Sequence, residues 1–291
     1  MARLISDKYE QWEKLCESRF ETLKENEEKL NAFFIGLYAM QAELTPEVDD
    51  SEITISRADL TRDIKSLISY AVGCLFGRYS LDRDGLCYAG GKWDPSAYKT
   101  IIPFRDNFIP INDIDGGLTK AVVSFIEKVY GSETLEQNLL FITSAIAGEG
   151  LPRSLLHSYL QKDFFKDHVK KYKGRPIYWQ VTSGKKGAFR GLIYLHRYDP
   201  ELPEIILNNY SVPRYEQLKN EQQLLNERFS GSSITEKAQL RRELNKYQSM
   251  LDEMNEFMQR LKKLAEQKIS IDLDDGVKVN YSKLKDILHP L

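Results

Sequence analysis

Apolar residues recur at a helical spacing through the first part of the chain. Over residues 6–44 they fall every three or four positions with charged residues between them, which is typical of an amphipathic helix. We therefore predict one long helix, kinked near Gly36 and ended by Thr45-Pro46. Because helices gain most of their stability by packing, this one should have a partner surface along its length.

The middle of the chain predicts a mostly helical body. The same spacing indicates helices over residues 59–79, 118–130, 135–147 and 152–172. Alternation of apolar and polar residues predicts a short strand at 53–56. The Gly, Pro, Asp and Asn content of 80–117 predicts loops, with extended pieces around Ile101 and Phe108.

A β-hairpin is predicted at residues 176–198. Two runs rich in aromatic and branched residues flank the glycine-bounded segment Ser183-Gly-Lys-Lys-Gly187, and such a pattern favours two strands around a turn. The tip of this hairpin would carry Lys185 and Lys186.

The last third of the chain predicts two antiparallel helices. From Leu240 the apolar residues follow at alternating spacings of four and three to Ala265, the rhythm of a heptad seam, with Met258 as one member. A similar run precedes the short turn Ser230-Gly-Ser-Ser233, and so short a connection makes the helices antiparallel. Asp274-Asp-Gly276 then predicts a small β-hairpin, followed by a short terminal helix.

These elements together predict a helix-rich α+β fold. We expect four segments: a long helix at 1–47, an α+β body with its basic hairpin at 48–212, the helical hairpin at 213–267, and the terminal hairpin and helix at 268–291.

The overall charge indicates no general affinity for nucleic acid. Lys and Arg total 41 against 43 Asp and Glu, a net charge of −2, so DNA affinity would need a local patch. The three cysteines lack Cys-x-x-Cys spacing, which argues against disulfides and fits a reducing cytoplasm. No apolar run approaches the roughly 18 residues of a membrane span.

Motifs for chemistry are missing from this sequence. No two prolines are adjacent, so the Pro-Pro turn of an amino methyltransferase is absent, and Gly148-Glu-Gly150 indicates a helix end instead of a cofactor loop. The four histidines lack metal-ligand spacing. In Asp272-x-Asp274-Asp275-Gly276 the glycine comes one residue too early for a calcium loop. We therefore assign no catalytic, cofactor-binding or metal-binding residue.

One segment concentrates positive charge. Residues 162–197 hold ten Lys or Arg against two Asp, a local net charge of +8, with aromatic residues between the cations. Such a surface suits DNA phosphates, and a two-stranded ribbon is narrow enough for the major groove. The alternatives are a protein-facing basic surface, and a solvated face over an aromatic core. The candidate DNA-binding residues are Lys170, Lys171, Lys173, Arg175, Trp179, Lys185, Lys186, Arg190 and Arg197.

Several long strings resemble the C-terminal region of the PglX family, the adenine-specific DNA methyltransferases of BREX phage-defence systems. They occur in order along most of the chain: Tyr38-Ala-Met-Gln-Ala-Glu-Leu-Thr-Pro-Glu-Val48, Ile68-Ser-Tyr-Ala-Val-Gly-Cys-Leu-Phe-Gly-Arg-Tyr-Ser-Leu81, Lys162-Asp-Phe-Phe-Lys-Asp-His168 to Arg175-Pro-Ile-Tyr-Trp179, Ser183-Gly-Lys-Lys-Gly187 with Leu192-Ile-Tyr-Leu-His-Arg-Tyr198, and Ile271-Asp-Leu-Asp-Asp-Gly-Val-Lys-Val-Asn-Tyr281.

The resemblance implies a longer parent enzyme that transfers a methyl group from S-adenosylmethionine to adenine N6. Its catalytic and cofactor motifs lie upstream and are absent here, so the chain is expected to be a non-catalytic fragment that helps bind double-stranded DNA. The expected partners are DNA and the upstream methyltransferase domain. The alternative is a docking module for other BREX proteins or for a phage inhibitor that mimics DNA.

Overall fold

A computed structural model describes residues 3–113 and 116–291 of the chain. The chain is rich in helix and has one small antiparallel sheet, which confirms the predicted α+β class. Two compact units can be distinguished, residues 1–68 with 126–149, and residues 69–125 with 150–291. The four segments expected from the sequence remain a prediction.

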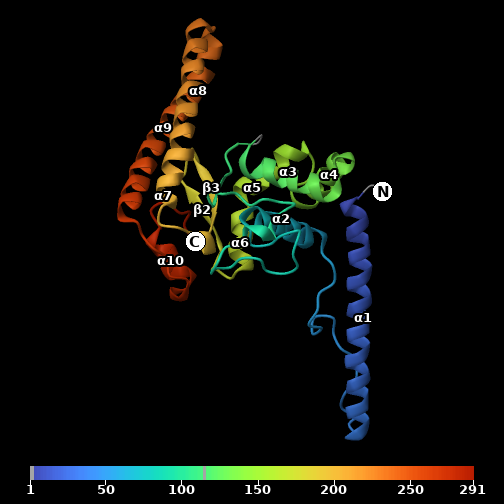
Figure 1. The fold of residues 1–291 in the computed structure, drawn as a ribbon. Coiled ribbons are helices and arrows are strands. Elements are labelled where there is room, and N and C mark those ends of the chain that lie inside the picture. Colours follow the sequence, from blue (N-terminus) through green and yellow to red (C-terminus); the bar gives the residue numbers. More distant parts are fainter. Residues whose placement is uncertain (1–2, 114–115) are drawn as a thin grey trace. The chain divides into compact units, whose positions relative to one another are not determined.

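The first unit is built on α1 (Ile5–Leu37), the long N-terminal helix in Figure 1. The start of α1 is tied to α4 (Leu135–Ile146), where the main-chain N–H of Ile5 donates to Oδ1 of Asn138 at 2.8 Å. Farther along α1, Phe20 packs against Val48 in a small apolar cluster. The segment after α1 therefore lies against the helix that precedes it.

Two predictions for this unit were wrong. Helix α1 ends at Leu37, well before Thr45-Pro46, because Ala39 adopts a left-handed φ of 55° that turns the chain. The strand predicted at 53–56 does not form. Ile53 lies in an irregular segment, and its side chain is buried in the Phe20 cluster. The alternation therefore reflected the burial of one side chain and not pairing with another strand.

The second unit contains a three-stranded sheet in the order β1-β3-β2. Its strands are β1 (Phe108–Pro110), β2 (Tyr178–Thr182) and β3 (Arg190–Tyr194). Both pairings are antiparallel, which confirms the predicted hairpin and adds β1 to its other side. No strand forms at Ile101.

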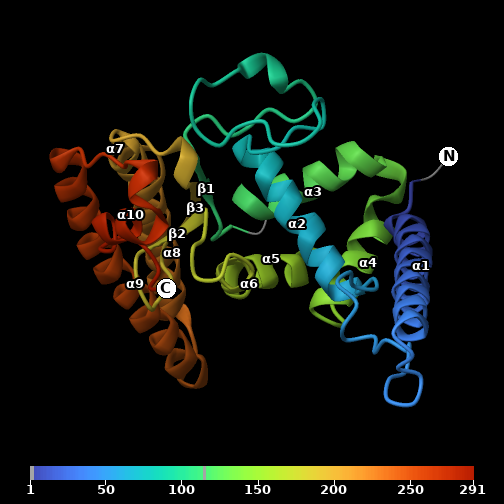
Figure 2. The same ribbon diagram turned by 90° about the horizontal axis from the view of Figure 1, so that it is seen from below.

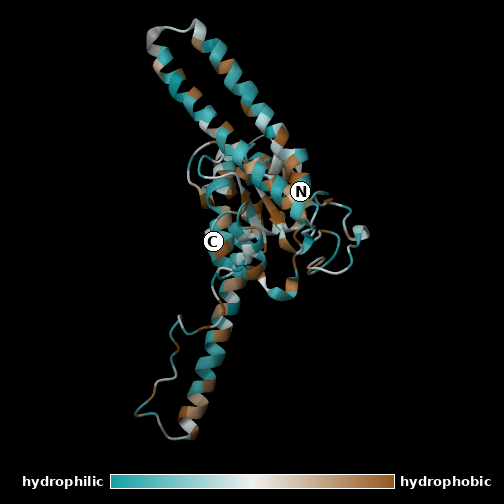
Figure 3. Ribbon diagram, turned by 90° about the vertical axis from the view of Figure 1, so that its left-hand side faces the viewer, coloured by the Kyte–Doolittle hydropathy of each residue, from teal (hydrophilic) through white to brown (hydrophobic). Residues whose placement is uncertain are grey.

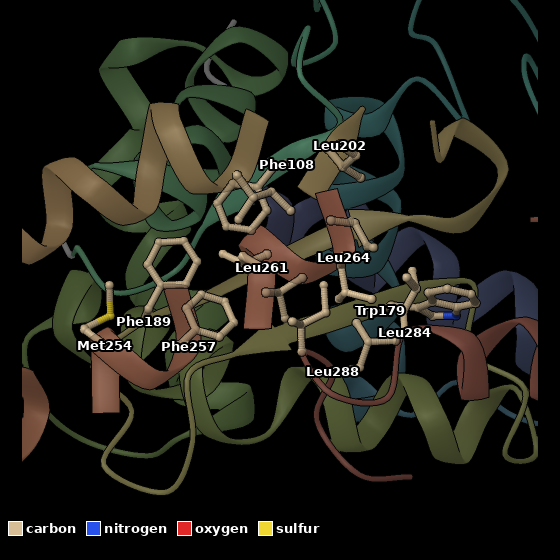
Figure 4. Close-up of a cluster of buried hydrophobic side chains, with 14 of the residues drawn as sticks. Phe108, Trp179, Phe189, Leu202, Met254, Phe257, Leu261, Leu264, Leu284 and Leu288 are labelled. Atoms are coloured by element: carbon tan, nitrogen blue, oxygen red, sulfur yellow. The ribbon is translucent and has the colours of Figure 1, made fainter. Parts of the chain in front are cut away.

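Both faces of this sheet are covered. Trp179 of β2 and Ile193 of β3 are paired neighbours and lie, with Phe108, in a large apolar cluster under α9 (Ile234–Gln267) (Figure 4). Tyr178 points to the opposite face because side chains alternate along a strand, and there it stacks on Phe76 with ring centroids 5.5 Å apart. The hairpin is therefore part of the core.

The structure contains further helices in both units. They are α2 (Leu60–Phe76), η1 (Pro95–Ala97), α3 (Gly117–Tyr130), η2 (Ser132–Thr134), α5 (Pro152–Lys162), α6 (Phe164–Lys171), η3 (Leu195–Arg197), α7 (Leu202–Ile205), η4 (Ile206–Ser211), α8 (Val212–Gly231), η5 (Leu273–Asp275) and α10 (Val277–Lys283). The helix predicted over 152–172 is thus broken at Asp163. Figure 2 shows the long irregular segment between α2 and β1 as a large loop.

The predicted helical hairpin is formed by α8 and α9. A capping box starts α9. The side chain of Ser233 accepts a hydrogen bond from the main-chain N–H of Glu236, and the side chain of Glu236 accepts one from the main-chain N–H of Ser233. Figure 3 shows the free end of this pair as largely hydrophilic, whereas the second half of α9 contributes to the apolar cluster. There the predicted Met254 and Leu261 are buried, but Phe257 and Leu264 are buried in place of the predicted Met258 and Ala265, because this half packs on the sheet instead of on a second helix.

The prediction of a C-terminal β-hairpin was wrong, because helical segments form there. Asp272 accepts a hydrogen bond from the main-chain N–H of Asp274 at 2.9 Å, which caps η5. Gly276, with φ 80°, then leads into α10. The Asp-Gly pair therefore links two helical segments, and Leu288 beyond them forms a single β-bridge with Val181 at the edge of the sheet.

Candidate nucleic-acid interface

Six of the nine predicted DNA-binding residues are exposed. Four lie close together in the sequence, at the end of α6 and in the loop before β2, and two lie in the turn between β2 and β3. They are Lys170, Lys171, Lys173, Arg175, Lys185 and Lys186. The two groups are separated along the chain by the whole of β2, so they lie at opposite ends of that strand.

The turn of the hairpin is held by α9. The carboxylate of Glu253 accepts hydrogen bonds from the main-chain N–H groups of Lys186 at 2.7 Å and Ala188 at 3.2 Å, and from the hydroxyl of Ser183 at 2.7 Å. The main chain of the turn is therefore fixed to a helix, while the side chains of Lys185 and Lys186 stay exposed.

The insertion of a free two-stranded ribbon into a DNA groove is not compatible with this structure. Strands β2 and β3 are almost wholly buried, with α9 on one face and the Phe76 and His168 rings on the other. The turn is itself docked on Glu253. Any contact of the hairpin itself with DNA would therefore use the exposed cations at its ends.

Three other predicted residues are engaged inside the protein. Trp179 is fully buried and its indole N–H donates to the carbonyl of Pro176 at 2.9 Å. Arg190 is half-buried and donates to the carbonyl of Gln161 at 3.2 Å. Arg197 is also half-buried and is held by main-chain carbonyls. Their positions support the sheet and its surroundings.

The side chain of His168 joins α6 to the start of β2. Its Nε2 accepts hydrogen bonds from the main-chain N–H groups of Ile177 at 3.1 Å and Tyr178 at 3.0 Å, and its ring stacks on Tyr178. Burial, reinforced by the charges of Arg78 and Lys171, lowers the pKa of His168 to about 3. The neutral ring therefore anchors the segment that carries Lys170 to Arg175.

The low pKa of His168 predicts a loss of stability in acid. Between the ordinary pKa of 6.5 and about 3, the unfolded state binds a proton that the folded state excludes. Stability therefore falls as the pH drops through this window, by about 2 kcal/mol from this residue between pH 7 and pH 5. Urea unfolding followed by circular dichroism at several pH values measures the effect.

The matched variant is His168→Gln. It should be less stable at neutral pH and show a shallower dependence on pH. The half-buried His157 and His196, whose pKa values are also lowered by burial, account for part of the remaining dependence of stability on pH. A variant that kept the full wild-type slope would contradict this role of His168.

An open groove lies beside the end of α6. Its volume is about 580 Å³, and its walls are formed by Val169 and Gly174 on one side and by Lys278 and Lys285, of α10 and the turn after it, on the other. Tyr281 contributes to its floor. The sequence reasoning missed Lys278 and Lys285 because it counted charge over one continuous segment and predicted a strand where α10 forms.

Across residues 3–113 and 116–291 there is no group of three His, Cys, Asp or Glu side chains placed to hold a metal ion. In the same ranges, every helix is too short or too polar to cross a membrane.

Two curated proteins are similar to this chain over most of its length. It is 42% identical over 300 residues to the adenine-specific methyltransferase PglX of Lacticaseibacillus casei (strain Zhang), a match that covers 97% of this chain. It is 38% identical over 260 residues to the adenine-specific methyltransferase BrxX of Escherichia coli O9:H4 (strain HS), covering 83% of this chain. The chain corresponds to the C-terminal region of PglX-type methyltransferases.

The match covers only a part of these relatives. The chain spans 24% of the Lacticaseibacillus protein and 21% of the Escherichia protein. No protein-family model matches it. The predicted resemblance is thus confirmed, while the activity of the whole relatives does not transfer to this segment as a finding.

Proposed function

We propose that this segment contributes DNA binding to a PglX-type adenine-specific methyltransferase and performs no chemistry itself. In the whole enzyme S-adenosylmethionine would be bound outside this segment, and the substrate would be double-stranded DNA in the cytoplasm. The observation that carries the proposal is the row of exposed cations from Lys170 to Arg175, held on a rigid base by His168, in a chain similar to two enzymes named as adenine-specific methyltransferases.

The physical argument is electrostatic. Exposed Lys and Arg neutralise DNA phosphates and release condensed counterions, which supplies affinity without sequence preference. Within the described residues, Lys170, Lys173 and Arg175 have no ion pair, so their charges are available to a ligand. Target recognition would need further contacts to base edges.

The test is a titration of a fluorescent DNA duplex with the purified chain at several salt concentrations. We expect binding that weakens steeply as salt rises, since each phosphate contact adds about 0.9 to the slope of log K against log salt. Absence of duplex binding at about 50 mM salt, where such contacts are strong, would contradict the proposal.

A specific prediction concerns the lysines of the hairpin turn. The double variant Lys185→Ala/Lys186→Ala should bind duplex DNA more weakly, with a salt slope reduced by about 2 if both side chains contact phosphates. Folding should be retained because Glu253 holds main-chain groups of the turn. An unchanged slope would exclude these two lysines from the interface.

A second candidate is docking to another protein. The end of α1 exposes large apolar side chains, among them Phe33 at 63%, Leu37 at 62% and Tyr38 at 67% of their surface. Figure 3 shows hydrophobic residues along this end of the helix. Exposed apolar groups of this size favour an interaction surface, for which the remainder of a methyltransferase polypeptide or another BREX protein is the candidate. A chain that ignores duplex DNA but captures such a protein would favour this function.

A further inference from the structure

We propose that the groove between α6 and α10 is a binding site for one strand of the DNA backbone, with phosphates at its rim and sugar or base against its floor. This inference rests on the proposed function, and it assigns the site to residues from two distant parts of the chain. Figure 1 labels both helices, and the groove is lined by residues of both.

The rim of the groove carries two lysines on its α10 side. Lys278 and Lys285 line one wall, and both are exposed and without an ion pair in the described part of the chain. On the other wall Gly174 lies between Lys173 and Arg175 in the sequence. Two cations that line one concave surface attract a polyanion more strongly than the same charges on a flat face, because their potentials add there. Lys173 and Arg175 flank the α6 side in sequence and do not line the groove.

The floor of the groove is largely apolar. Tyr281 and Leu288 line it, and Val169 adds an apolar side chain from the adjoining wall. The hydroxyl of Tyr281 is engaged with the carbonyl of His289, so the tyrosine is fixed in place. An apolar floor beneath a cationic rim suits a nucleotide, whose sugar and base are stripped of water while its phosphate stays at the edge. A volume of about 580 Å³ accommodates a unit of that size.

The groove is also supported by the sheet. The main-chain N–H of His289 donates to the carbonyl of Gln180 at 2.8 Å, and the N–H of Thr182 donates to the carbonyl of Ile287 at 2.9 Å. These bonds place the segment after α10 along the edge of β2. The His289 ring packs edge-on against Phe165 of α6, with centroids 5.5 Å apart. Both walls are therefore attached to the same rigid base.

The test compares Lys278→Ala/Lys285→Ala with wild type in titrations of a short single-stranded oligonucleotide and of a duplex. We expect affinity to fall about ten- to a hundredfold at 0.1 M salt, and the salt slope to fall by about 1.5 to 2. Both lysines are exposed, so their truncation leaves the core intact. Circular dichroism confirms that each variant is folded.

Lys283→Ala is the matched control. Lys283 lies on the same helix and carries the same charge, but its ammonium pairs with Asp275 at 3.0 Å and it does not line the groove. This control should change the slope by far less. A second variant, Ser282→Trp, fills the groove without changing charge and should weaken binding of the oligonucleotide.

The outcomes separate the two proposals. If the wild-type chain binds no DNA, the proposed function fails and the groove assignment fails with it. If the wild type binds DNA but the groove variants bind as tightly, or Lys283→Ala weakens binding as much, the groove is excluded while the proposed function stands.

Discussion

Replacing Trp179 with alanine is expected to lower the free energy of unfolding by about 3–5 kcal/mol, the usual cost of removing a buried aromatic side chain. Trp179 is fully buried and packs edge-on against Tyr281, with ring centroids 5.1 Å apart. Figure 4 shows it beside Leu284 and Leu264. Alanine would leave a large cavity there and remove the donor to Pro176. Urea unfolding followed by circular dichroism measures the loss.

Trp179→Phe is the variant that separates packing from DNA contact. Phenylalanine keeps an aromatic ring in the cavity, so this variant should be considerably more stable than Trp179→Ala and should bind duplex DNA like wild type. Trp12→Phe is a second control because Trp12 is 43% exposed and should affect stability little. A stable Trp179→Phe variant with weakened DNA binding would show that the indole takes part in the interface after all.

The case of Trp179 shows what the sequence pattern could and could not predict. The run 176–182, in which most residues are apolar, aromatic or branched, correctly indicated a strand. It could not tell that both faces of the strand would be covered, one by α9 and the other by Phe76 and His168. Aromatic residues between cations resemble a stacking surface in sequence, whereas here the rings point inward and the cations lie beyond the strand ends.

Helix positions were predicted well, and helix ends less well. The spacing of apolar residues located α2, α3, α4, α8 and α9 because it follows directly from 3.6 residues per turn. The end of α1 depends on a left-handed Ala39, which no composition rule indicates. The Asp-Gly pair before α10 is equally compatible with a hairpin and with a helix start. In the structure the pair precedes a helix, and Asn280 and Tyr281 of that helix are buried.

Only about half of the candidate site was predicted from the sequence. Cations close in sequence, such as Lys170 and Lys173, were found by counting charge over one segment. Lys278 and Lys285 line the same groove as Val169 and Gly174 only because the chain folds back along β2. No pattern in the sequence contains that information, since it arises from tertiary hydrogen bonds at a strand edge.

Replacing Arg197 with methionine is expected to cost about 2–4 kcal/mol of stability, because partly buried carbonyls that lose a charged donor are left unpaired. Nη1 of Arg197 donates to the carbonyls of Phe76 at 3.1 Å and Phe104 at 2.9 Å, and Nη2 donates to the carbonyl of Arg105 at 3.1 Å. The guanidinium also lies 4.3 Å from the ring centre of Trp93. One side chain thus ties both ends of the 77–107 segment to the sheet.

The same contacts distinguish Arg197 from a phosphate ligand. In the methionine variant, residues 77–107 should become more sensitive to limited proteolysis, while the salt slope of DNA binding by the folded protein should stay at its wild-type value. Arg197→Lys should restore only part of the stability, because a single ammonium cannot reproduce the planar fork that serves three carbonyls. A variant with unchanged stability and a salt slope of DNA binding reduced by about 1 would instead show that Arg197 contacts a DNA phosphate. The guanidinium geometry favours the first result, since donors already committed to three carbonyls and a ring face would have to leave them to reach a phosphate.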